Sequence, residues 1–176
     1  MLKIKLSSQE IELVKKYSVN AELGGKSNIR SDTNRRSTLA GDQLTAQLGE
    51  AALSKFMTGS VDLYEKTRQE RDLDKWHGDK GSDLLGYNVD VKTSRARRGL
   101  DFPYNLWVRE REYHEDTIYF LAIVSEDDDS SVFFLGWCLG SEIKSKTDDR
   151  YEKNSRELRS MEPLASWFKR QNLEVI

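Results

Sequence analysis

Residues 117–138 read TIYFLAIVSEDDDSSVFFLGWC, two apolar runs on either side of an acidic segment. Both runs, 117–124 and 132–138, are nearly all apolar, which is typical of central strands covered on both faces. The EDDDSS between them is short and polar, as a turn should be. The stretch therefore predicts two core strands of a sheet, with Cys138 as a small buried side chain.

The composition excludes several classes of protein. The 176 residues contain 28 Lys and Arg against 30 Asp and Glu, a formal net charge of −2. Hydrophobic residues make up 37% and aromatic residues 10% of the chain, enough for one core and too many for a disordered chain. No apolar run approaches the ~20 residues that a bilayer requires, so we expect no membrane partner. The start, MLKIKLSSQE, lacks a secretory h-region, and a single cysteine suits a reducing compartment, so we expect a cytoplasmic protein.

Helical periodicity is clearest in residues 42–57, DQLTAQLGEAALSKFM, where Asp42 is a good N-cap and the apolar residues form a wide arc. Gly49 in the middle of this helix costs about 1 kcal/mol relative to Ala, which predicts a close approach of its backbone to a sheet. A shorter helix is predicted for residues 7–20, where Ser7 and Glu10 fit a capping box.

The other segments carry weaker signals. Residues 24–41 read as a loop, 61–64 as a strand, and 104–109 as a strand or the start of a helix. A short helix is expected at 141–144, and 145–157 look loose and polar. A last helix begins at Pro163, and core positions are expected for Trp107, Trp137 and Trp167. Together the elements predict an α/β fold, a mixed central β-sheet flanked by helices.

The stretch 79–94, DKGSDLLGYNVDVKTS, predicts a β-hairpin. Strands 83–85 and 88–93 would flank Gly86-Tyr87 as a II′ turn. That register places Asp83 opposite Asp90, with Cβ atoms about 4.5–5.5 Å apart, where two carboxylates repel each other. A divalent cation would remove the conflict, and oxygen-only ligands favour Mg²⁺, with Mn²⁺ able to substitute.

Lys92 lies two residues beyond Asp90, so the period of a strand puts both side chains on one face. A metal held by carboxylates beside an ammonium group can hydrolyse a phosphodiester. The metal lowers the pKa of a bound water and neutralises charge on the phosphate, and the lysine can orient that water or stabilise the transition state. A salt-bridge ladder on an exposed strand is the alternative interpretation of these residues. Glu50, at the edge of the apolar arc of the predicted helix, could join the site or simply face solvent.

Three motifs resemble the PD-(D/E)XK nuclease superfamily, which has the restriction-endonuclease-like fold. They are GDQLTAQLGE at 41–50, GSDLLGYNVDVKTS at 81–94 and FFLGW at 133–137. The chain departs from the pattern in having Ser82, not proline, before the first acid.

The resemblance implies a single nuclease-like domain over residues 1–176. Its αβββαβ core would span about 41–138. An N-terminal helix and loop would occupy 1–40, and a C-terminal helical extension 139–176.

The resemblance also implies roles for five residues. Asp83 and Asp90 would be acidic metal ligands, Val91 would offer its backbone carbonyl, and Glu50 would be an additional ligand from the helix. Lys92 would be the catalytic lysine. The predicted activity is thus a Mg²⁺-dependent nuclease that hydrolyses DNA phosphodiester bonds, with endonuclease action favoured.

DNA binding needs a cationic rim around an anionic site. Two basic clusters could supply it, formed by Arg35 and Arg36 and by Arg95, Arg97 and Arg98; solvated basic loops are the alternative. Many nucleases of this fold dimerise, so the resemblance is compatible with a homodimer. The other functions considered are a catalytically inactive nucleic-acid-binding module with a nuclease-like fold and a hydrolase of small phosphates.

Four further polar residues lie near these motifs. Asn105 and Arg109 lie where substrate contacts are possible. His77 could contact DNA or serve as a general base but is more simply an exposed loop residue, and His114 is expected to be structural or exposed.

Overall fold

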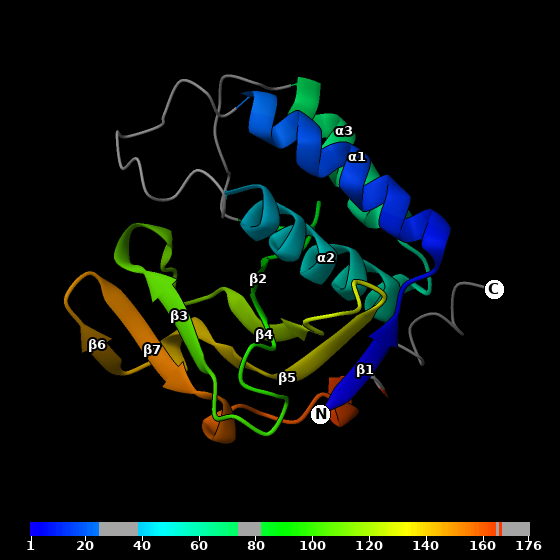
Figure 1. Cartoon of the computed structure of the whole chain (residues 1–176). Coiled ribbons are helices and arrows are strands. Elements are labelled where there is room, and N and C mark those ends of the chain that lie inside the picture. The colour runs from blue at the N-terminus through cyan, green and yellow to red at the C-terminus, as the bar shows by residue number, and fades with distance from the viewer. Residues whose placement is uncertain (25–38, 74–81, 165, 167–176) are drawn as a thin grey trace.

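The computed structural model describes residues 1–24, 39–73, 82–164 and 166 (Figure 1). The predictions for Arg35, Arg36, His77 and Trp167 lie outside these residues, as does most of the predicted loop.

The main sheet has four strands in the order β1-β5-β4-β2. β4 (Ile118–Val124) and β5 (Ser131–Leu139) occupy its centre, so the two apolar runs are core strands as predicted. β2 (Val89–Arg95) runs parallel to β4, whereas the other neighbours are antiparallel, which makes the sheet mixed. β1 (Leu2–Lys5) was not predicted, although its apolar residues alternate with two lysines as in an edge strand.

Three helices, α1 (Ser8–Gly24), α2 (Leu39–Thr58) and α3 (Asp62–Leu73), cover one face of this sheet. In Figure 1, α2 lies against the sheet, with α1 and α3 packed outside it. The predicted capping box begins α1: the Ser7 N–H donates to Glu10 Oε2 (2.6 Å), and the Glu10 N–H donates to Ser7 Oγ (3.3 Å). The described residues contain no helix long and apolar enough to cross a membrane.

The strand predicted at 61–64 is wrong, because α3 begins at Asp62. Val61 and Tyr64 are both buried three residues apart, which is the spacing of one helix face. Asp62 and Glu65 place acidic side chains in the first turn, where they interact favourably with the helix dipole.

Gly49 lies where α2 crosses β2, as the sequence indicated. A Cβ atom at this position would stand 2.0 Å from Thr93 Oγ1. The glycine therefore allows the helix and the strand to approach closely, and this contact fixes Glu50 relative to β2.

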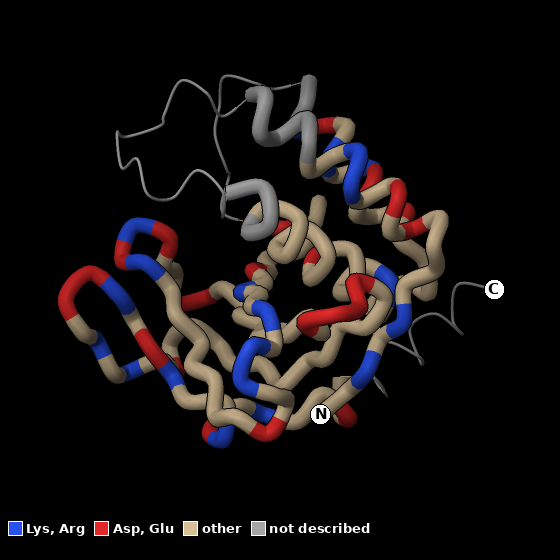
Figure 2. Tube along the Cα trace, in the orientation of Figure 1, with Lys and Arg blue, Asp and Glu red and all other residues tan. Residues whose placement is uncertain are grey.

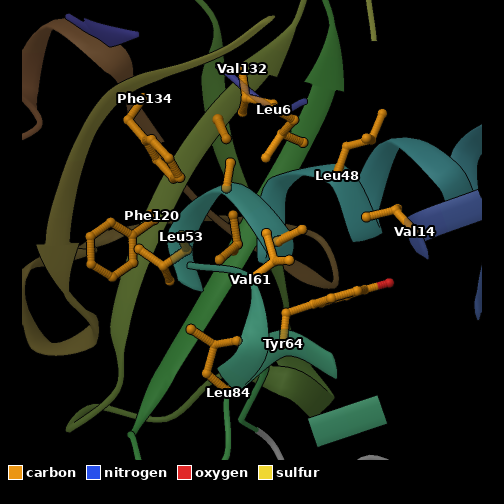
Figure 3. Close-up of a cluster of buried hydrophobic side chains, with 14 of the residues drawn as sticks. Leu6, Val14, Leu48, Leu53, Val61, Tyr64, Leu84, Phe120, Val132 and Phe134 are labelled. Carbon is orange, nitrogen blue, oxygen red and sulfur yellow. The ribbon is translucent and has the colours of Figure 1, made fainter. Parts of the chain in front are cut away.

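The larger core fills the space between the helices and the sheet (Figure 3). Side chains from α1, α2, α3 and the central strands meet there, and those at its centre are almost completely buried: Val14, Leu48, Leu53, Tyr64, Leu84, Phe120 and Phe134. The Tyr64 hydroxyl donates to Gln47 Oε1 (2.7 Å), which satisfies a polar group inside an apolar cluster.

A second sheet, in the order β3-β7-β6, packs on the other face of the main sheet. It consists of β3 (Asn105–Arg109), β7 (Arg150–Asn154) and β6 (Ser145–Thr147). The prediction that 145–157 is loose is therefore wrong. Nearly every residue of this hairpin is polar, so its sequence lacks an apolar face that would have marked strands. A 3-10 turn at Gly140–Glu142 stands where the short helix was expected.

The core beneath the second sheet is small and continuous with β4. It contains Leu106, Val108, Tyr119, Leu121, Cys138 and Ile143. The Tyr113 ring stacks on Tyr151, with 3.9 Å between centroids, and joins the second sheet to this core.

The hairpin predicted for 83–93 is also wrong in its first strand. Residues 83–85 are not a strand, and Leu84 begins a turn in which the Tyr87 N–H donates to the Leu84 carbonyl (3.1 Å). Gly86, with φ of +80°, is the third residue of this turn, which is the glycine position of a type II turn and not of the expected II′ turn. The chain therefore approaches β2 without forming a strand beside it.

Candidate active site

A cavity of about 750 Å³ runs along the outer edge of β2, between the helices and the second sheet. Its lining comes from α2, α3, the turn before β2, β2, β3 and β4, together with the 3-10 turn η2 (Glu110–Glu112) and the residues after it. All five predicted catalytic and metal-binding residues line this one cavity: Glu50, Asp83, Asp90, Val91 and Lys92.

β2 presents Asp90 and Lys92 on a single face, as its period requires. They stand in register with Tyr119 and Leu121 of β4, on the side of the second sheet. Val91 points to the opposite face and joins the core beneath the helices. This alternation anchors the strand while it holds an acid and an ammonium together.

Asp83 lies at the edge of β2 because of hydrogen bonds to that strand and not because of the predicted strand pairing. Its N–H donates to the Val89 carbonyl (2.9 Å), and its Oδ2 accepts from the Val91 N–H (2.6 Å). Asp83 thus forms hydrogen bonds with two backbone groups at the edge of β2, through its own N–H and its carboxylate. Arg71 of α3 lies 3.9 Å from the other carboxylate oxygen.

The charge of Asp83 and burial both affect the pKa of Asp90. Asp90 is only 9% exposed. Burial and the charge of Asp83 raise the pKa of Asp90 to about 7, although the Lys92 ammonium opposes the shift. An additional positive charge nearby would therefore stabilise the ionised form of Asp90.

Lys92 lies between two acids. Its Nζ is 2.9 Å from Asp90 Oδ2 and donates to Glu112 Oε2 (3.1 Å). Burial alone would lower the pKa of Lys92, but Asp90 and Glu112 raise it above its ordinary value, so the side chain is an ammonium. Glu112, from η2, is a site residue that the sequence did not reveal, because only the tertiary fold brings it to β2.

Glu50 is 6% exposed, so the alternative that it faces solvent is wrong. Its carboxylate pairs with the guanidinium of Arg68 from α3, and that guanidinium also lies 5.5 Å from the Tyr64 ring. Arg68 and Arg71 are three residues apart and therefore share a helix face. That spacing could have identified them had residues 62–73 been recognised as a helix.

The donor chemistry of the cavity fits a hard divalent cation. Glu50, Asp83 and Asp90 offer carboxylate oxygens, the ligands that suit Mg²⁺ or Mn²⁺. Among the described residues, His, Cys, Asp and Glu side chains do not form a cluster of three or more that could hold a metal as they stand. Asp83 and Asp90 both line the cavity at the edge of β2, whereas the Glu50 carboxylate is turned toward Arg68.

The described members of the basic clusters differ in their surroundings. Arg95 is held by Thr45 Oγ1 (3.0 Å), the Ser125 carbonyl (3.0 Å) and Asp129 (2.6 Å). Arg97 is exposed, and the Arg98 guanidinium lies 4.8 Å from the Phe102 ring. In Figure 2 acidic and basic positions interleave along β6, β7 and α1.

Trp107 lines the cavity and is 53% exposed, so its predicted core position is wrong. β3 turns Leu106 and Val108 inward and leaves Trp107 on the outer face. Asn105 and His114 also line the cavity, whereas Arg109 does not. The His114 backbone N–H donates to the Tyr119 hydroxyl (2.9 Å).

Comparisons with protein-family models, with curated proteins and with solved structures found no match. The functional interpretation therefore rests on the residues and geometry of the cavity.

Proposed function

We propose that the chain is a metal-dependent nuclease that hydrolyses DNA phosphodiester bonds, with endonuclease action favoured, and that the cavity along β2 is its active site. One observation carries the proposal. Glu50, Asp83, Asp90 and Lys92 come from α2, a turn and β2, yet all line one cavity. A ladder of charges on an exposed strand would not need a buried aspartate or a glutamate from a helix.

The arrangement of elements supports a restriction-endonuclease-like core as part of this proposal. α2 carries Glu50 against β2, β2 carries the Asp90-Val91-Lys92 motif, and β4 and β5 complete a mixed sheet. One difference from the αβββαβ order is that residues 89–139 contain a 3-10 turn and no α-helix. The PD-(D/E)XK assignment thus depends on α2, β2 and the two central strands.

In this proposal Asp83, Asp90 and the Val91 carbonyl would hold Mg²⁺, joined by Glu50. Bound Mg²⁺ would polarise the phosphate and lower the pKa of a water molecule. Lys92 has three N–H donors, of which Asp90 and Glu112 use two, so one would remain for a phosphate oxygen. If Glu50 exchanged its contact with Arg68 for the cation, the guanidinium would be free to bind the phosphate.

The test is a cleavage assay on plasmid, on single-stranded and duplex linear DNA and on free nucleotides, with Mg²⁺ or Mn²⁺ and an EDTA control. We expect wild-type protein to cut DNA, and D90N and K92M to lose about 100-fold or more, the usual cost of removing a preorganised electrostatic group. K144M, at an exposed lysine outside the cavity, is the matched control. Undiminished cutting by both D90N and K92M, or no cutting with either metal, would contradict the proposal.

One observation favours a second candidate, a catalytically inactive nucleic-acid-binding module. Each predicted acid already has a basic partner: Arg68 for Glu50, Arg71 for Asp83 and Lys92 for Asp90. A network neutralised in this way can be purely structural. Such a module would bind DNA with a steep salt dependence and cut nothing in the same assay.

A further inference from the structure

We propose that Trp107 is a stacking platform for an unpaired base, so that the proposed nuclease acts on single-stranded DNA. This inference rests on the proposed function and names the form of its substrate.

The position of Trp107 follows from the alternation of β3. Leu106 and Val108 are fully buried against the main sheet, which leaves Asn105 and Trp107 on the face that borders the cavity. Trp107 therefore shares the cavity with Asp90 and Lys92, although it belongs to a different sheet.

The indole is held in place and still half exposed. Its Nε1 donates to Glu152 Oε2 (3.3 Å), which lies opposite it in the register of β3 and β7. The Arg150 guanidinium lies 5.7 Å from the ring centroid. Despite these contacts, 53% of Trp107 is accessible, more than any other tryptophan or tyrosine among the described residues. A fixed, accessible aromatic surface beside a candidate catalytic group is what base stacking requires.

The form of the substrate follows from what this surface can bind. In a duplex the base faces are already stacked on their neighbours, so an aromatic wall gains little from paired DNA. An unpaired base has a free π-face, and stacking is tolerant of sequence. The cavity, about 750 Å³, is in the range of sites for single small ligands, the scale of a nucleotide.

The protein's own charges in this cavity are balanced. Its lining contains four acidic side chains and four Lys or Arg side chains, which cancel formally. Attraction of phosphates would therefore depend on the bound cation, and Trp107 can add a contribution that is not electrostatic.

The experiment measures binding of labelled oligonucleotides to the D90N protein, which removes the complication of cleavage. We expect W107A to weaken binding of a single-stranded oligonucleotide roughly 5- to 100-fold, the range for loss of one stacked base. W107F should retain most of the affinity, because it keeps an aromatic ring. An abasic oligonucleotide of the same length should bind equally well to the D90N protein with and without the W107A substitution.

W137F is the matched control. Trp137 also has an arginine near its ring, Arg159 at 4.8 Å, but it lies outside the cavity lining. We expect W137F to bind as the parent does. Thermal melting of each variant detects misfolding, and if W107A unfolds, the comparison of normal with abasic oligonucleotides on the parent protein still decides whether bases are bound.

The results separate the two proposals. Tighter binding to duplex than to single strands, or equal affinity of normal and abasic oligonucleotides, would overturn the stacking proposal while leaving a nuclease intact. Mononucleotides that bind as tightly as oligonucleotides would overturn the assignment of a strand as the substrate. Failure to cut any nucleic acid with Mg²⁺ or Mn²⁺ would instead contradict the proposed function, whatever the binding results.

Discussion

Substitution of Gly49 by alanine tests the packing of α2 on β2. At an exposed helical position this change stabilises by about 1 kcal/mol. Here the new Cβ would lie 2.0 Å from Thr93 Oγ1 and 3.2 Å from Thr93 Cγ2. Even a rotamer that turns the Cβ hydrogen of Thr93 toward Gly49 leaves the Thr93 Cβ 3.1 Å from the new methyl group, and β-branched side chains are stiff at χ1. The helix and strand must therefore move apart.

The magnitude follows from two opposing contributions. Overpacking in a well-packed region costs about 1–3 kcal/mol, and a contact this short belongs at the upper end of that range. After the gain of about 1 kcal/mol in helix propensity, G49A should lose about 2 kcal/mol of unfolding free energy. For a chain of this length the melting temperature should fall by about 4–8 °C.

Thr93→Ala provides the matched variant. Within the described part of the chain Thr93 Oγ1 is buried and has no hydrogen-bond partner, so its removal should cost little. We expect G49A/T93A to recover much of the loss, measured by urea and thermal unfolding of all four proteins. Recovery should be partial, because the Thr93 Cβ would remain 3.1 Å from the new methyl group. A rise in stability for G49A, or strictly additive effects of the two changes, would refute the close approach of α2 to β2.

Two further predictions test other parts of the structure. Ser7→Ala should lower the unfolding free energy by about 1 kcal/mol, because it removes the N-cap of α1; chemical denaturation that shows no change would contradict the capping role of Ser7. Burial raises the pKa of Cys138 to about 11, so the native protein at pH 9 should react with a thiol reagent far more slowly than the protein in denaturant, and equal rates would show that the thiol is accessible.

The sequence predicted the elements whose apolar pattern matched their surroundings. β4 and β5 are buried on both faces and read as uniform apolar runs, and α2 has a wide apolar arc. The β6–β7 hairpin was missed for the opposite reason, because strands such as Arg150–Asn154 display mainly polar residues. Trp107 was assigned to a core because tryptophans are usually well buried, but the register of β3 turns it outward.

Asp83 and Asp90 line the same cavity as predicted, although the strand pairing from which this was predicted does not form. Asp83 was expected beside Asp90 because of a strand pair that the structure does not contain. The carboxylate of Asp83 instead binds the Val91 N–H and so arrives at the same strand edge. Glu112 and Arg68 could not be predicted in the same way, since their contacts to Lys92 and Glu50 span 20 and 18 residues across separate elements.

The two outer strands of the main sheet, β1 and β2, bear on how copies of the chain can associate. Lys3 and Lys5 are exposed along β1, and Asp83 occupies backbone positions along β2. If two copies joined their sheets antiparallel through β1, lysines would face lysines, and a strand added to β2 would have to displace a carboxylate. Continuation of the main sheet from one molecule to the next is therefore disfavoured at both ends, so a homodimer would have to use a surface other than these two strand edges.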